Sequence, residues 1–180
     1  NMSIQFFKNG TQEPGTKFGC IGSIERETES KEVMKKCEGI EVKKLSKPMK
    51  SNLKITAHVP VDVLRDYFGL RTDGLKEGVW AYGTLSKGLD FVLTADEIDE
   101  FENVTKLVAY PNCSNAAGFG AKIENGADEV AELELEVTAL PDEAGEIYYE
   151  AFTNELTDQT VAEQWHTQFT RTLVEEVPVP

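Results

Sequence analysis

The amino-acid sequence predicts a mainly β protein of the α+β class, folded as a single domain over residues 1–180. Several segments alternate apolar and polar residues, which is the period of a half-buried strand, and helical periodicity is confined to short stretches. The 180 residues, 40% of them hydrophobic, are enough to build one sizeable core. No run approaches the roughly 18 consecutive apolar residues of a membrane-spanning helix. We therefore expect a protein made in the cytoplasm, without a membrane partner.

The first sixty residues indicate an N-terminal arm or strand, up to about residue 30, followed by two further strands. Ser3 to Lys8 is a short apolar run, and a turn-rich stretch and an extended polar segment follow it. Ile40 to Lys43 and Leu53 to Val59 alternate at period 2. The sequence Lys-Pro-Met-Lys between them favours a turn. We expect Lys43 to Asn52 to form the tip of a hairpin.

One short amphipathic helix, Val61 to Gly69, should follow these strands. Leu64 and Phe68 stand four residues apart, Asp62 favours the start of the helix, and Gly69 supplies its end.

The middle of the chain predicts two more strands and a helical turn. Val79 to Tyr82 and Leu89 to Leu93 have the composition of strands, and Thr94 to Glu97 has the capping-box pattern that opens a helix, here as far as Phe101. The acidic cluster from Asp96 to Glu102 also suggests calcium, but its spacing does not match an EF-hand loop. A solvated helix start accounts for the same residues.

The second half carries the clearest strand of the sequence. Thr105 to Tyr110 is a strand candidate, and Glu132 to Val137 alternates strictly, with leucine and valine on one face and glutamate on the other. An aromatic segment returns after a turn, so we expect a hairpin from Glu132 to Phe152. Apolar residues then recur every four positions over residues 161–173, which favours a helix, although three threonines keep a strand open. The role of the segment from about 160 to 180 stays open.

The two halves of the chain differ in net charge. Residues 1–90 hold 15 basic and 12 acidic side chains, a net +3, and residues 91–180 hold 3 and 20, a net −17, giving −14 overall. The basic excess is concentrated between Lys31 and Lys54, where eight lysines face three glutamates. Opposite polarity of this kind suits contact between the basic part of one copy and the acidic part of another. Two solvated faces of a monomer would have the same composition.

No catalytic or metal-binding pattern emerges, and we expect no cofactor and no enzymatic activity. The three cysteines lack a C-x-x-C spacing, and His58 and His166 lack the spacing of zinc ligands. Two alternatives remain. One is a small enzyme with an unrecognised site. The other is a monomeric β-sandwich that binds carbohydrate or peptide, for which Trp80 with Tyr82, or the Tyr148–Tyr149 pair, would form the aromatic platform.

The order and spacing of five segments carry a resemblance to a known family. These segments are Leu53 to Pro60, Val63 to Gly69, Gly78 to Gly83, Leu133 to Val137 and Tyr148 to Phe152. Together they resemble the major tail proteins, or tail tube proteins, of long-tailed siphophages that infect Gram-positive bacteria. The resemblance covers roughly Phe18 to Thr153. It implies a β-sandwich or partly closed barrel with one flanking short helix, six copies per ring, and rings stacked into the tail tube of the virion, through which DNA passes.

The resemblance also suggests two functional surfaces and a set of partners. The candidates for contact between rings are Lys43, Lys44, Lys47 and Lys50. The candidates for the lumen wall are Glu132, Glu134 and Glu136, because carboxylates repel phosphates and let DNA slide without specific binding. The implied partners are further copies of the chain, the tape-measure protein, and tail-terminator or baseplate proteins.

Overall fold

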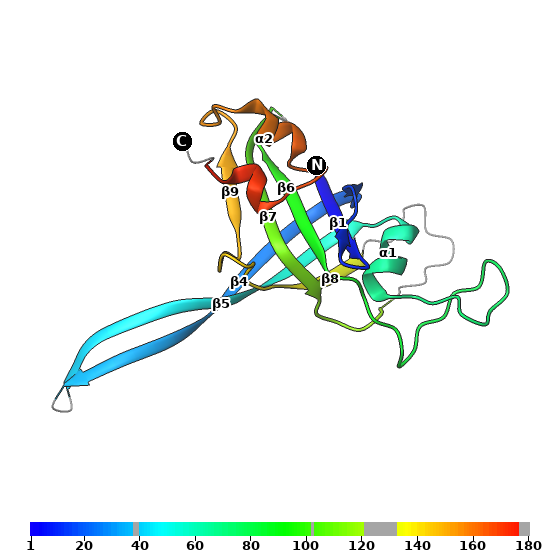
Figure 1. The fold of residues 1–180 in the computed structure, drawn as a ribbon, viewed down its shortest axis with the longest axis horizontal. Helices are drawn as coiled ribbons and strands as arrows, with labels where there is room; N and C mark the ends of the chain where they lie inside the picture. The colour runs from blue at the N-terminus through cyan, green and yellow to red at the C-terminus, as the bar shows by residue number, and fades with distance from the viewer. Residues whose placement is uncertain (38–39, 102, 121–132, 177–180) are drawn as a thin grey trace.

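The computed structural model describes residues 1–37, 40–101, 103–120 and 133–176. Within these residues the chain forms one antiparallel sheet with three short helices (Figure 1). The strands are β1 (Met2–Lys8), β2 (Thr11–Gln12), β3 (Thr16–Lys17), β4 (Cys20–Cys37), β5 (Ile40–His58), β6 (Phe91–Ile98), β7 (Val104–Asn115), β8 (Leu133–Ala139) and β9 (Tyr149–Phe152). The helices are α1 (Val61–Phe68), α2 (Gln159–Gln164) and α3 (Arg171–Val174). The mainly β prediction is confirmed.

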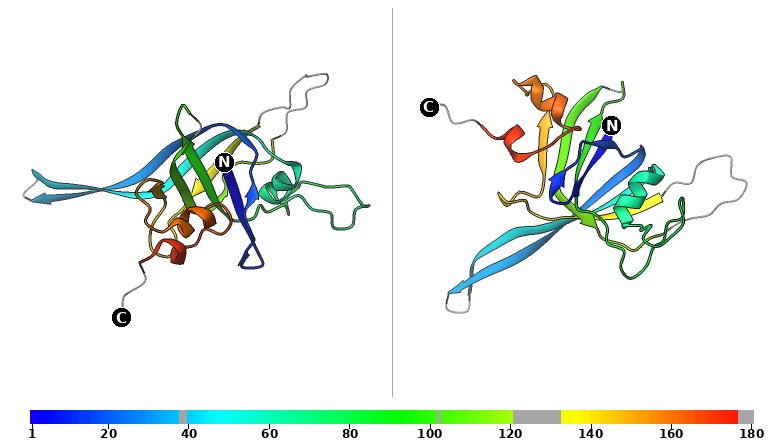
Figure 2. Two further views of the ribbon diagram at one scale, coloured as in Figure 1. Left: turned by 90° about the horizontal axis from the view of Figure 1, so that it is seen from above. Right: turned by 45° about the vertical axis from the view of Figure 1, so that its right-hand side comes forward.

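The sheet curls so that its two ends come together through one short piece of chain. Its strand order is β2-β1-β6-β7-β8-β5-β4, with β3 also paired to β1 and β9 to β7. β3 ends at Lys17 beside β1, and β4 begins at Cys20 beside β5, so the chain between these residues links opposite ends of the order. A single curved sheet of this kind corresponds to a partly closed barrel, and Figure 2 shows the strands wrapping around its interior.

The main core fills the inside of this curved sheet. It is built from buried side chains of β1, β5, β6, β7, β8 and α1, among them Met2, Ile4, Phe6, Leu53, Ile55, Tyr67, Phe91, Leu93, Leu135 and Val137. α1 lies where the sequence predicts a helix, and the Tyr67 hydroxyl donates to the Glu136 carbonyl oxygen at 2.7 Å. Gly69 ends the helix with φ of 68°, a conformation that favours glycine. The helix is thus fixed to the sheet by its buried face.

A second, smaller core lies on the other face of β6 and β7. Trp165 and Phe169 pack there against Val92, Leu107 and Ala109. The expected helix over residues 161–173 is interrupted: α2 and α3 are separate, and Phe169 lies in the irregular chain between them. The four-residue spacing correctly predicts the buried side chains because each short piece still turns its apolar side to the sheet. The segment is an integral part of the described fold.

β5 corrects the prediction for the lysine-rich segment. Residues 43–52 are not the tip of a hairpin, because they lie inside one strand that pairs with β4 along its length. Pro48 is accommodated by a β-bulge: Lys50 pairs with Glu29 and Pro48 with Ser30, so Met49 is the extra residue. Proline cannot donate to a neighbouring strand but is tolerated at a bulge. β4 ends at Cys37 and β5 begins at Ile40, and residues 38–39 lie outside the described residues.

Two further expectations for the middle of the chain are wrong. Val79 to Tyr82 is not a strand, since only Ala81 forms an isolated bridge, to Arg71. Thr94 to Glu97 belongs to β6 instead of opening a helix, because Thr94 is fully buried and pairs with Ser3 on one side and Ala109 on the other. Pairing on both sides outweighs a local capping pattern.

The expected hairpin from Glu132 to Phe152 is also absent from the described strands. β8 pairs with β5 and β7, and β9 pairs with β7. At the N-terminus, the strand is the alternative that is found: residues 2–6 of β1 are buried and pair with β6. The expected strand at 105–110 is confirmed within the longer β7, and that at 89–93 begins two residues later, as β6.

Candidate assembly surfaces

The β4–β5 hairpin projects from the sheet as a two-stranded ribbon (Figure 1). β5 pairs with β8 only from Ser51 to Ala57, and Ser51 lies opposite Thr28 of β4. Beyond this point, within the residues the structure describes, each strand of the hairpin pairs only with the other. A two-stranded ribbon is at best marginally stable alone in water. Its length is therefore a reason to look for a partner.

Apolar side chains lie exposed along this ribbon. Val33, Met34, Leu45 and Met49 are each about half exposed, at 48–54%. Val33 and Leu45 lie directly opposite one another and so share a face, whereas Met34 lies opposite Lys44 on the other face. Cross-strand neighbours of this kind form one continuous apolar contact. Exposed apolar contacts on a projecting element are typical of surfaces that a partner covers.

The predicted lysines lie on β5 and differ in what surrounds them. Lys44 pairs with Glu32 at 2.7 Å and Lys50 with Glu29 at 3.1 Å. A hydrogen bond from Asn52, followed by the contact with Lys50, lowers the pKa of Glu29. Lys43 lies in β5 at a position paired with Lys35 of β4.

Lys47 and Lys31 differ from these because they lie opposite each other. Neither has an ion pair among the described residues. Like charges that face each other across a ladder repel. An acidic surface that covered this face would relieve the repulsion.

The outer face of β8 is acidic, as the alternation predicts. Glu134 and Glu136 are exposed while Leu135 and Val137 are buried; Glu132 lies outside the described residues. Lys54 of β5 lies opposite Glu136, and its ammonium is 3.6 Å from Glu134. The predicted face is therefore partly neutralised by one lysine.

The register extends this acidic face across β5 to β4. Glu25 lies opposite Lys54, and Glu27 opposite Asn52, so both glutamates share the outer face with Glu134 and Glu136. Four carboxylates against one ammonium leave a net charge of 1 − 4 = −3. The sequence alone does not reveal Glu25 and Glu27 as part of this face, because their position depends on which strands are neighbours.

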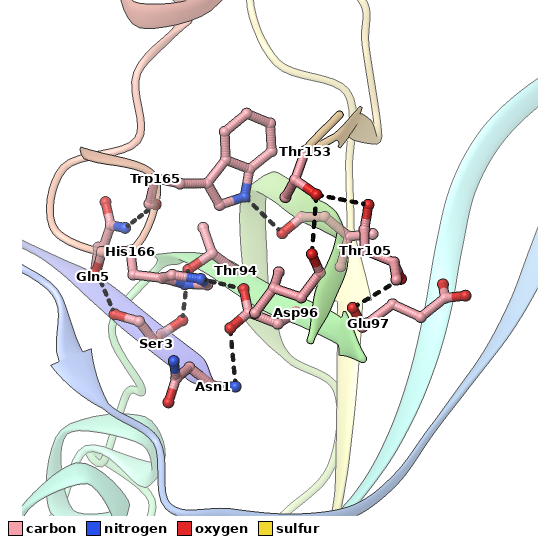
Figure 3. A network of polar contacts seen from close by, with 12 residues as sticks. Asn1, Ser3, Gln5, Thr94, Asp96, Glu97, Thr105, Thr153, Trp165 and His166 are labelled. Carbon is pink, nitrogen blue, oxygen red and sulfur yellow. Dashed lines mark hydrogen bonds and ion pairs between the residues drawn. The ribbon is translucent and has the colours of Figure 1, made fainter. Parts of the chain in front are cut away.

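A partly buried polar network ties Asn1 and the C-terminal segment to the sheet (Figure 3). His166 contacts Asp96 through Nε2 and Thr94 through Nδ1, and its carbonyl accepts from Ser3 at 2.7 Å. The terminal ammonium of Asn1 lies 3.0 Å from Asp96. Burial would raise the pKa of Asp96, but the hydrogen bonds from His166 and the ammonium outweigh it, and the pKa lies below its usual value. We assign this network a structural role.

The candidate aromatic platforms are occupied within the chain. Trp80 and Tyr82 are both exposed. However, the Arg65 guanidinium covers Trp80 at 4.3 Å, and Tyr82 packs against Phe119 at 5.3 Å between ring centroids. Both candidate rings therefore have a partner within the chain.

The two rings of the Tyr148–Tyr149 pair pack in different places. Tyr148 packs against Tyr110 of the main core, and Tyr149 packs against Phe169 of the second core. The two tyrosine rings therefore do not form one platform.

The described residues also bear on metal binding, membrane spanning and thiol reactivity. Residues 1–37, 40–101, 103–120 and 133–176 hold no group of three or more His, Cys, Asp or Glu side chains that could hold a metal ion. Within the same ranges no helix is long and apolar enough to cross a membrane. Cys113 is fully buried, and burial raises the pKa of its thiol. A buried thiol of this kind is unreactive.

Comparisons with known proteins give only distant structural likenesses. No family model and no curated protein matches the chain. Among solved structures, the tube terminating cap of the anti-feeding prophage has 8% identity and a TM-score of 0.43, covering 84% of this chain and 88% of that one. The PVC sheath-tube complex, an extracellular contractile injection system in its extended state, has 9% identity and a TM-score of 0.44, covering 85% and 89%. A chain of the anti-feeding prophage baseplate has 12% identity and a TM-score of 0.39, covering 87% and 95%.

Proposed function

We propose that this chain is a structural virion protein that self-assembles into hexameric rings, stacked as a bacteriophage tail tube through which DNA passes. The single observation that carries the proposal is the β4–β5 hairpin. Its projecting part extends beyond the sheet and exposes the Val33–Leu45 pair, and among the described residues the two strands of this part pair only with each other. A second copy of the chain is always present where the protein is made, and we propose it as the partner of the hairpin.

We propose head-to-tail contacts between copies. The hairpin projects from one side of the molecule, and in this arrangement a different surface of the next copy receives it (Figure 1). Contacts between unlike surfaces repeat from copy to copy, and they close into rings or extend into filaments. The basic hairpin and the acidic second half of the sequence supply complementary charge for such contacts.

The acidic outer face of β8, β5 and β4 is our candidate for the lumen wall. Glu134 and Glu136, joined by Glu25 and Glu27, would repel phosphates and leave few contacts that release counterions from DNA. DNA would therefore pass without being bound. The exposed surfaces left on the first and last rings would meet the tape-measure protein and the tail-terminator or baseplate proteins.

Self-assembly is the direct test. As its concentration rises, purified protein should assemble from monomers into rings and then into hollow tubes. Light scattering measures the assembly, and negative-stain electron microscopy images its products. Because the proposed contacts include charges, assembly should depend on ionic strength. A protein that stays monomeric at every concentration and salt level would contradict the proposal and favour the monomeric binding module.

A further inference from the structure

A groove on the face opposite the main core has the chemistry of a receptor for the hairpin. Its volume is about 770 Å³, and it lies between the ends of β1, β6 and β7, the loop after β8, and α3. Its apolar lining residues are Phe7, Val92, Pro111, Pro141 and Phe169. Its charged lining residues are Asp142, Glu143, Arg171 and Glu175. One cation against three carboxylates gives the groove a net charge of 1 − 3 = −2.

Two of the three carboxylates are available to a partner. Asp142 is held within its own chain, since it accepts hydrogen bonds from the backbone of Ala144 and Glu146 and from the Tyr149 hydroxyl. Glu143 is exposed, and Glu175 has only a long contact, 3.9 Å, with Arg171. Exposed contacts of this length contribute little to stability. Glu143 and Glu175 can therefore turn to a partner's cations at small cost.

The hairpin presents the complementary pattern. On one face, the apolar Val33–Leu45 pair is followed immediately by the Lys31–Lys47 pair. The charged side chains described along the ribbon are Glu29, Lys31, Glu32, Lys44, Lys47 and Lys50, a net charge of 4 − 2 = +2. An apolar pair beside a cationic pair thus matches an apolar floor beside an acidic rim.

We propose that the hairpin of one copy seats in this groove of a second copy, with Val33 and Leu45 on the apolar floor and Lys31 and Lys47 against Glu143 and Glu175. This inference rests on the proposed self-assembly and names the receiving surface. The occupant must come from another copy, because the hairpin runs away from α3 of its own chain (Figures 1 and 2). Seating also weakens the electrostatic repulsion between the two facing lysines, because each gains an anionic neighbour.

A charge-exchange experiment tests the contact. The hairpin variant is Lys31→Glu with Lys47→Glu, and the groove variant is Glu143→Lys with Glu175→Lys. Each variant alone sets like charges against each other, and the assembled fraction should fall by about tenfold or more. In an equimolar mixture, the acidic hairpin meets the basic groove while the unchanged surfaces meet each other. Assembly should therefore return, with the two variants alternating.

Matched controls separate this contact from general charge effects. Lys76→Glu with Lys87→Glu reverses two exposed lysines outside the hairpin, and Glu163→Lys reverses an exposed glutamate of α2 outside the groove. These controls should assemble like the unchanged protein. Circular dichroism and the thermal midpoint of each variant, measured before mixing, identify any that fails to fold.

The outcomes distinguish this inference from the proposed function. If the unchanged protein assembles and the groove variant assembles equally well, the groove is not the receptor, and the proposed function stands. If both variants fail and their mixture also fails, the hairpin does not meet this groove. If the unchanged protein never assembles, both proposals fall together.

Discussion

The imidazole of His166 lies against the carboxylate of Asp96, although the two residues are 70 positions apart in the sequence. Asp96 comes from β6, and His166 follows α2 in the C-terminal segment. The Asp96 side chain is only 2% exposed. This contact, with the 2.8 Å bond between His166 and Thr94, fastens the C-terminal segment to the sheet.

Removing the imidazole should destabilise the fold. His166→Ala leaves the buried Asp96 carboxylate without one of its partners, and we expect the free energy of unfolding to fall by roughly 1–3 kcal/mol. Urea denaturation measures the change. Glu97→Gln, at the next position of β6, weakens the contact between the exposed Glu97 carboxylate and Lys106 of β7; it is the control and should cost less than about 1 kcal/mol. Equal losses in the two variants would contradict a special role for His166.

Asp96 should also make stability depend on pH. Its pKa in the folded protein lies below its usual value, so its contribution is complete above the unfolded pKa of about 3.9 and is lost as the pH falls through the lowered folded pKa. Other carboxylates, such as Asp142, shift in the same direction. The stability difference between the unchanged protein and Asp96→Asn therefore isolates this group. That difference in the free energy of unfolding should shrink as the pH falls below about 5. It can be measured over the pH range in which both proteins stay folded.

Trp165 should be essential to the second core. It is 1% exposed, packs edge-on against Phe169 and donates its indole N–H to the Val108 carbonyl at 3.0 Å. Trp165→Ala should cost about 3–5 kcal/mol of unfolding free energy. Trp165→Phe keeps an aromatic ring but loses the hydrogen bond, and it should cost less. If the alanine variant were nearly as stable as the unchanged protein, the C-terminal segment would not be part of the domain.

The apolar pair of the hairpin should matter for assembly and not for folding. Val33→Ser with Leu45→Ser removes two side chains that are 52% and 54% exposed, so the free energy of unfolding of the subunit should change by less than about 1 kcal/mol. Light scattering should nevertheless show that assembly is lost. The control, Val79→Ser with Leu85→Ser, changes comparably exposed side chains of the 70–90 loop. Assembly that survives the hairpin change would place the hairpin outside the interface.

The acidic face should affect the passage of DNA. Glu134→Lys with Glu136→Lys reverses two exposed charges on β8. If this face lines the lumen, tails should still assemble, and DNA release from the virion should slow because each new phosphate contact binds by releasing counterions. The defect should lessen as salt rises. An unchanged release rate in low salt would place the face outside the lumen, and failed assembly would place it in a contact.

Local patterns could predict the elements whose cause is local. The α1 helix depends on its own apolar spacing and on Gly69, and the faces of β8 follow from its strict alternation. The strand β5 could not be recognised across Pro48, because the bulge that accommodates proline depends on the register with β4. Thr94 likewise takes its conformation from two neighbouring strands.

The candidate surfaces likewise combine features that the sequence could predict with features that depend on which strands are neighbours. The lysines and the glutamates of β8 could be proposed from composition and period, but their shared faces with Val33 and with Glu25 required the strand order. The groove could not be found at all from the sequence. Its lining comes from segments as far apart as Phe7 and Glu175, and no periodic pattern connects them.

The continuity of β4 and β5 has a mechanical consequence. Both strands run from the projecting ribbon into the curved sheet, so tension on the ribbon acts along their axes. The hydrogen bonds that hold residues 51–57 of β5 to β8 are perpendicular to that direction. They are therefore loaded together in shear and do not peel apart one at a time. A neighbour that pulls on the ribbon during bending of a filament would transfer its load directly into Leu53 and Ile55, at the centre of the subunit.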